Sequence, residues 1–240
     1  MLSSWDGKLR TRPQWPGTPM ANNKKFEILR RLAAIYFGLL IFSAPHHVSA
    51  NESVCENFSD VDFDGRFSEA LGERLYQRGF YPEAMTAWQC AILEEGDAGA
   101  AFRLGIEYLD AKIVERDPER AVGYLHTSAF RGDRRAQFEL GTAHDDGEFV
   151  ERDPAKAMLW YFSASHQGDP GAEFNLAMIY ESGVVVDADI VLAYAYYHLA
   201  DLHGLPVLAR EAMERLAVDL PGDQLDLAIR TAQRIEEARR

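Results

Sequence analysis

Apolar positions recur at the spacing of amphipathic helices along most of the chain after residue 66. Ala101, Leu104, Gly105 and Tyr108 stand at positions i, i+3, i+4 and i+7, which places them on one face of a helix. Leu140 and Gly141 occupy the same positions in a later helix. The pattern predicts a series of helices with one buried face each.

A second helix is predicted in each unit from its capping residues. Asp117 and Asp153 each precede a proline; aspartate is favoured before the first helical turn, and proline is favoured within it. Gly132 and Gly168 follow about fifteen residues later and are suited to end these helices. The capping residues therefore predict pairs of helices, and the chain is expected to be all-α.

The helical pairs repeat with a period of 36 residues. The run V-E-R-D-P at 114–118 recurs unchanged at 150–154. We call a set of positions 36 residues apart a column. Columns of one residue type or character are Phe102, Phe138 and Phe174; Gly96, Gly132, Gly168 and Gly204; and Trp88, Tyr124, Trp160 and Tyr196. Because one such unit cannot bury its own apolar face, we expect an α/α superhelical solenoid of stacked units.

The period predicts about four units, at 67–99, 100–135, 136–171 and 172–207. Residues 208–240 are more polar and lack the period, so we expect capping helices that cover the last apolar face. The residues expected to cover that face are Leu208, Met213, Leu216, Leu225, Ala228, Ala232 and Ile235.

The segment before the repeats has the layout of an export signal. Lys24, Lys25, Arg30 and Arg31 precede an apolar run at 32–42. A short run of small residues that ends at position 50 then has the pattern of a cleavage site. This order is typical of a cleaved signal peptide, and the apolar run is too short for a spanning helix. We therefore interpret 1–19 as an extension upstream of a true start at Met20, 20–50 as the signal, and 51–66 as an irregular segment. The alternative is a signal retained as a membrane anchor.

The net charge of the chain and its predicted export exclude some classes of binding partner. The full chain has a net charge of −13, and removal of residues 1–50 would leave 18 basic and 36 acidic residues, a net charge of −18. Such an acidic chain lacks the basic surface that binds nucleic acid, so basic partners or cations are favoured. We expect a periplasmic or secreted protein with no stable membrane span after cleavage.

The two cysteines, Cys55 and Cys90, form a candidate disulfide in an oxidising compartment. The bridge would attach the segment 51–66 to the first helical pair. Two unpaired thiols are the alternative.

The repeat unit resembles a known family. The matching residues at 136–172 are Ala136, Leu140, Gly141, Gly147, Asp153, Lys156, Ala157, Trp160, Tyr161, Ala164, Gly168 and Ala172. This pattern is similar to the Sel-one-like repeat, a relative of the tetratricopeptide repeat, over about 67–207. The resemblance implies a helical superhelix that binds proteins, often in bacterial envelopes. Envelope-assembly factors and periplasmic regulators of sensor kinases are examples.

In related repeats the first helix of each unit lines the concave side. We therefore expect partner-binding residues at first-helix positions that vary between units while their neighbours repeat. These positions are Arg103, Ile106, Asp110, Glu139, Thr142, Asp146, Asn175, Met178 and Ser182. Plain solvated surface is the alternative at each of them.

Other functions have weaker support. The order D-x-D-x-D-G at Asp60, Asp62 and Asp64 is like the start of a calcium loop, but Leu71 stands where the bidentate glutamate belongs. No nucleophile or phosphate-binding motif is visible, so we expect no enzyme and no cofactor. The alternatives to a scaffold are a hydrolase or ligand-binding protein of the cell wall and a calcium-responsive envelope module.

Overall fold

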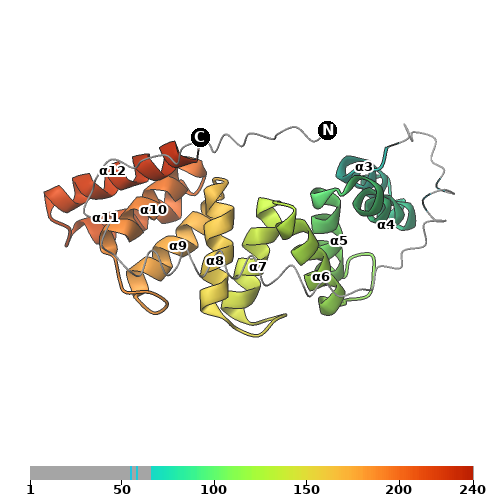
Figure 1. Cartoon of the computed structure of the whole chain (residues 1–240), viewed down its shortest axis with the longest axis horizontal. Helices are drawn as coiled ribbons and strands as arrows, with labels where there is room; N and C mark the ends of the chain where they lie inside the picture. Colours follow the sequence, from blue (N-terminus) through green and yellow to red (C-terminus); the bar gives the residue numbers. More distant parts are fainter. Residues whose placement is uncertain (1–54, 56–57, 59–65, 240) are drawn as a thin grey trace, which may run out of the picture. The chain divides into compact units, whose positions relative to one another are not determined.

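The structure is a computed structural model that describes Cys55, Phe58 and residues 66–239, all of which belong to one compact unit. The described segments are helical, without a strand among them, and they follow one another in chain order (Figure 1). The elements are α3 (Glu69–Gln77), α4 (Tyr81–Cys90), the π-helical η3 (Ala91–Glu95), α5 (Ala98–Asp110), α6 (Pro118–Phe130), α7 (Arg134–Asp146), α8 (Pro154–His166), α9 (Pro170–Ser182), α10 (Ile190–His203), α11 (Pro206–Ala217) and α12 (Gly222–Ala238).

Aspartates begin six of these helices. In α5 the side chain of Asp97 accepts a hydrogen bond from the backbone N–H of Ala100, and in α6 Asp117 accepts one from Arg120. Such a bond satisfies a backbone donor that has no partner inside the helix. The same arrangement recurs in α7 to α10 at Asp133, Asp153, Asp169 and Asp189.

Helices pack in consecutive pairs because small residues allow close approach. A Cβ atom at Gly105 of α5 would lie 2.9 Å from the Leu125 side chain of α6, and one at Gly141 of α7 would lie 2.6 Å from the ring of Tyr161 in α8. Each pair also packs against the next, so that the apolar faces are covered by stacking. The predicted all-α solenoid of helical pairs is confirmed.

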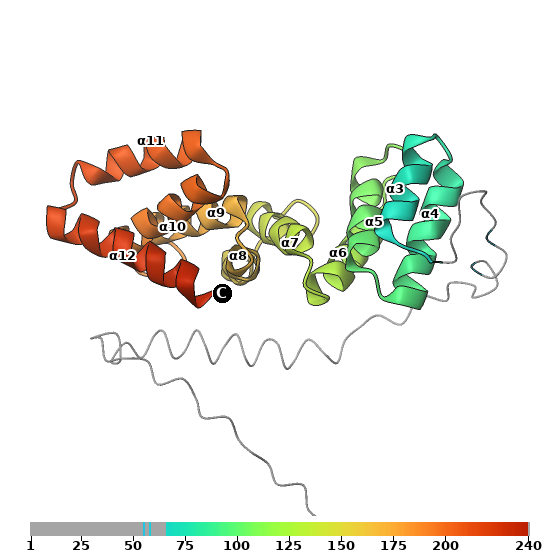
Figure 2. The same cartoon turned by 90° about the horizontal axis from the view of Figure 1, so that it is seen from above.

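The C-terminal helices α11 and α12 both pack against α10, with α10 between them (Figure 2). Met213, Leu216, Ala228 and Ala232 are buried in this region. Leu208, which the sequence also predicts to cover the last apolar face, is only half-covered itself, with 51% exposure.

The helix starts refine the repeat boundaries. α5, α7 and α9 begin at residues 98, 134 and 170, two residues before the predicted unit starts. α11 begins at Pro206, which is 36 residues after Pro170, so the period continues for one helix into the segment where the sequence pattern had faded.

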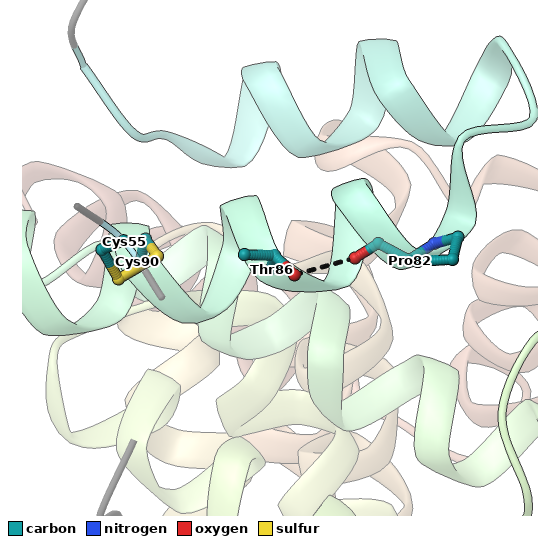
Figure 3. The surroundings of a disulfide bond; sticks show 4 residues. All are labelled: Cys55, Pro82, Thr86 and Cys90. Carbon is teal, nitrogen blue, oxygen red and sulfur yellow. Dashed lines mark hydrogen bonds between the residues drawn. A yellow bond between two sulfur atoms is a disulfide. The ribbon is translucent and has the colours of Figure 1, made fainter. Parts of the chain in front are cut away.

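A disulfide joins Cys55 to Cys90 at the end of α4 (Figure 3). The Cα atoms are 5.6 Å apart, and both residues are buried in one cluster with Leu75 and Trp88. The structure thus contains the predicted bridge, and it attaches the residue before the repeats to the first helical pair.

The predicted extension at 1–19, the predicted signal at 20–50 and the acidic triplet Asp60, Asp62 and Asp64 lie outside the described residues. Among the described helices, none combines the length and the apolar character needed to cross a membrane.

Candidate protein-binding surface

The nine first-helix positions singled out from the sequence lie on α5, α7 and α9, and none of them is buried. Four are exposed and five are half-buried. The exposed ones are Asp110, Asp146, Met178 and Ser182, and the half-buried ones are Arg103, Ile106, Glu139, Thr142 and Asn175. We call these positions together the first-helix surface.

Arg103 is already engaged by the protein's own side chains. Its guanidinium forms an ion pair with Glu73 at 3.0 Å and lies over the rings of Tyr76 and Trp88. It also lies 3.6 Å from the buried Glu107. Arg103 therefore connects α3, α4 and α5, and this contact leaves it less available to a partner than its sequence position suggested.

Glu139 of α7 is in the opposite situation. Its carboxylate is half-buried and has no cation within ion-pair distance among the described residues. Burial raises the pKa of Glu139, and the charges of Asp110 and Asp169 raise it further. Asp110 itself is paired with Lys112 at 2.8 Å. A cation beside Glu139 would relieve an unfavourable charge.

Thr142 is held by a buried tyrosine of the same pair. The hydroxyls of Tyr161 and Thr142 are 3.4 Å apart, and Asn175 also hydrogen-bonds Tyr161. Burial raises the pKa of Tyr161 to about 12. These contacts link α7, α8 and α9 beneath the first-helix surface.

Met178 and Ser182 line a groove between α9 and α11, which we call the α9–α11 groove. Its volume is about 550 Å³, and the residues that line it are Phe174, Met178, Glu181, Ser182, Tyr197, Leu208, Glu211, Ala212 and Arg215. Sequence reasoning missed the α11 residues because only Pro206 still marked the period there.

The polar groups of this groove are largely paired with one another. Arg215 donates to both carboxylate oxygens of Glu181, and the Tyr197 hydroxyl donates to one of them at 2.8 Å. These donors lower the pKa of Glu181, while burial and the neighbouring Glu181 raise the pKa of Tyr197. Glu211 is exposed on the α11 rim with no ion-pair partner among the described residues.

A second cluster of charges surrounds Glu173 of α9, which does not line the groove. Glu173 is completely buried and accepts hydrogen bonds from Arg239 at 2.6 Å and from His203 Nδ1 at 2.9 Å. Arg239 also donates to the Ser165 hydroxyl at 3.0 Å. The cluster joins the end of α12 to α8, α9 and α10.

Comparison with protein families gives one match. The model of the Sel1 repeat matches residues 98–133, 134–169 and 170–200. The chain belongs to the Sel1 repeat family. Each match begins where α5, α7 or α9 begins, so the helical pairs of the structure are the repeats. The pair formed by α3 and α4 lies outside the matched residues.

Two solved Sel1-type structures are similar to the chain. One is a protective antigen of uropathogenic Escherichia coli strains with an SLR fold, at 28% identity and a TM-score of 0.61; the match covers 70% of this chain and 37% of that chain. This chain therefore spans little more than a third of that protein. The other is a Sel1 repeat protein from Oxalobacter formigenes, at 31% identity and a TM-score of 0.49, covering 52% of this chain and 93% of that chain. No curated protein matches the chain.

Sel1 repeats generally mediate protein–protein interactions, and this supports a scaffold role for the chain. Within the described residues, no three histidine, cysteine, aspartate or glutamate side chains are grouped so that they could hold a metal ion. The first-helix surface and the α9–α11 groove are the two candidate places where the described residues could meet a partner.

Proposed function

We propose that this Sel1 repeat protein is an exported scaffold that binds an envelope or signalling protein on its first-helix surface. The observation that carries the proposal is the contrast between columns. The core columns, such as Leu104, Leu140 and Leu176, keep one residue type and are buried. The column of Ile106, Thr142 and Met178 changes at every unit, and none of its members is fully buried.

The contrast has a physical reason. A residue that stacks between units meets the same neighbours in every unit, so one residue type fits throughout the array. A residue that contacts a partner meets a different part of that partner in every unit. Preformed repeat surfaces of this kind bind peptides or helices by complementary side chains rather than by chemistry.

Export supports the envelope location in this proposal. The segment 24–50 has the order of a signal peptide. The Cys55–Cys90 disulfide is also a bond that persists in oxidising compartments such as the periplasm.

In-cell crosslinking followed by affinity capture and mass spectrometry tests the scaffold. One variant replaces Glu139, Asp146 and Met178, which are two acidic residues and one half-exposed apolar residue of the first-helix surface. The matched control replaces Glu119, Glu151 and Phe162, which lie off that surface and have the same character; Phe162 is 49% exposed and Met178 is 50% exposed.

We expect one dominant envelope partner that is lost in the first variant and kept in the control. A partner kept by the first variant and lost in the control would place the binding site on the other helices. The absence of any partner, with the protein exported and folded, would contradict the scaffold function.

A further inference from the structure

The α9–α11 groove is lined by Phe174, a phenylalanine of a repeating column whose neighbours differ from those of the other two members. Phe102 is covered by the guanidinium of Arg135, which lies 4.4 Å from its ring centre. Phe138 packs against Gly171, where an added Cβ would lie 2.7 Å from the ring. Phe174 is half-buried like the other two rings and packs against Tyr197, but neither an arginine nor a glycine of this column lies against it, and it lines the groove.

The reason lies in the column that covers these rings. Arg135 and Gly171 belong to one column, and the next residue in it is Val207 of α11, whose side chain points into solvent with 78% exposure. Neither a guanidinium nor a close glycine backbone therefore reaches Phe174. The groove lies at this last junction, between α9 and α11.

Apolar side chains on both sides of the groove are in contact with water. Met178 of α9 is 50% exposed and Leu208 of α11 is 51% exposed, and Tyr197 lies below them with its ring 5.1 Å from that of Phe174. Burial of such side chains by an apolar group is favourable, and methionine adapts its shape to different partners. The volume of about 550 Å³ accommodates one or two large apolar side chains.

The charged residues beside the groove indicate which charge the partner carries next to its apolar side chain. Arg215 neutralises Glu181 inside the groove. Glu139 on α7 and Glu211 on α11 occupy one column on either side of α9, and neither has a cation within ion-pair distance among the described residues. Residues 66–239 also contain 31 acidic and 17 basic residues, so the surrounding field attracts a basic segment.

We propose that the α9–α11 groove binds a basic amphipathic segment of the partner protein, with a large apolar side chain between Met178 and Leu208 and lysine or arginine beside Glu139 and Glu211. This inference rests on the proposed scaffold function and names the site and the chemistry of the partner. A helix with apolar residues three or four positions apart presents both features on one face.

Selection from a phage-displayed library of random 16-residue peptides tests the proposal, with the purified, disulfide-bonded protein as the bait. We expect the enriched peptides to carry large apolar residues at helical spacing together with lysine or arginine. The enriched peptides are then synthesised, and their affinity is measured by fluorescence anisotropy at about 150 mM salt, where distant charges are screened.

Two pairs of variants locate the binding site. Leu208→Asp places a charge in the groove, and we expect it to weaken binding at least about tenfold. Val207→Asp is the matched control, since Val207 is adjacent and exposed but does not line the groove. Glu211→Gln and Glu139→Gln should each weaken binding about threefold, as expected for charges at the rim. Glu214→Gln, at an exposed α11 position that does not line the groove, should leave binding unchanged.

Four results would overturn the proposal: enriched peptides that are acidic or lack apolar residues; equal effects of Leu208→Asp and Val207→Asp; no enriched peptide at all; or a small apolar compound that occupies the groove while no peptide does. The crosslinking experiment keeps these results separate from the scaffold function. A cellular partner that is lost in the Glu139, Asp146 and Met178 variant but kept by Leu208→Asp would reject the groove and retain the scaffold.

Discussion

Glu107 and Glu173 are two buried glutamates, one near each end of the described helices, and the protein accommodates them differently. Glu107 on α5 is 1% exposed, and Glu173 on α9 is 0% exposed. Burial raises the pKa of both carboxyls. Glu173 has hydrogen bonds at both carboxylate oxygens, from Arg239 and His203. Among the described residues, Glu107 is paired only with the guanidinium of Arg103, at 3.6 Å, and its Oε2 atom has no hydrogen-bond partner.

The preceding repeat has an uncharged pair at the positions of the C-terminal cluster. Gln167 donates to Gln137 at 2.9 Å, and His203 and Glu173 occupy the same two columns 36 residues later. A neutral pair is thus replaced by an ionisable pair in the repeat that meets α12, whose Arg239 supplies the compensating charge. A charge that is fully paired can hold a terminal helix in place.

The N-terminal end is held by other means. The Cys55–Cys90 disulfide, the buried Trp88 and the stacking of Arg103 on aromatic rings stabilise α3, α4 and α5 without a fully paired buried charge. The stability of the two ends of one array is therefore expected to respond to different conditions. The N-terminal end depends on the redox state, and the C-terminal end depends on charge pairing.

The largest effect is expected from loss of the disulfide. Replacement of Cys55 and Cys90 by serine should lower the free energy of unfolding by about 4 kcal/mol, because the bond closes a loop of 35 residues in the unfolded chain. Guanidinium unfolding of both proteins without reductant measures the difference. Hydrogen exchange should increase in α3 and α4 and stay unchanged in α12; an equal increase at both ends would contradict the comparison.

Removal of the charge at the C-terminal end should have the next largest effect. Glu173→Leu leaves Arg239, whose side chain is 7% exposed, without its main partner, so we expect a loss of about 3 kcal/mol. Urea unfolding measures the loss, and faster hydrogen exchange in α12 locates it. Glu214→Leu, at an exposed position of α11, is the control and should change stability little. Unchanged exchange in α12 would show that the cluster does not hold this helix.

Acid pH should lower the free energy of unfolding through His126, which lies between the two ends of the array. Burial lowers the pKa of His126 to about 4, and its Nδ1 atom has no hydrogen-bond partner within the part of the chain that the structure describes. The unfolded chain binds a proton near pH 6.5 and the native protein only near pH 4, so this side chain lowers the free energy of unfolding as the pH falls between these values. Its contribution should reach about 2 kcal/mol at pH 4.5. The raised pKa values of Glu107 and Glu173 act in the opposite direction, because the native state binds their protons more tightly.

His126→Phe introduces the residue found 36 positions later, at Phe162, and should remove this loss. Urea unfolding at pH 7 and pH 4.5 measures it in both proteins, with His166→Phe at an exposed position as the control. If His126→Phe loses as much stability between pH 7 and pH 4.5 as the natural protein, the acid sensitivity originates at the ends of the array and not at His126.

The smallest effect is expected at Glu107. Glu107→Leu removes a charge that is poorly paired, while Arg103 keeps Glu73 and the rings of Tyr76 and Trp88. We therefore expect a change in the free energy of unfolding within about 1 kcal/mol of zero, in either direction. Thermal and urea unfolding beside Glu173→Leu provide the direct test. An equally large loss in both variants would remove the distinction between the two ends.

Much of the fold could be predicted because the same capping and packing residues recur in several repeats. The aspartates that begin α5 to α10, Gly105 and Gly141 at close helix contacts, and the leucine column each recur at the period. The first-helix surface could be identified for the same reason, as columns that vary. The engagement of Arg103 and the exposure of Leu208 could not, because each depends on side chains outside its own unit.

The amino-acid sequence by itself determined the helices, their caps, their period and the residues that face the core. These features depend on contacts within one unit or on contacts repeated in every unit, and local spacing encodes them. Only the tertiary structure decided that Glu173 meets Arg239 across 66 residues and that Phe174 and Leu208 line one groove. Both depend on how α11 and α12 pack against α10, and no period in the sequence specifies a contact that occurs once.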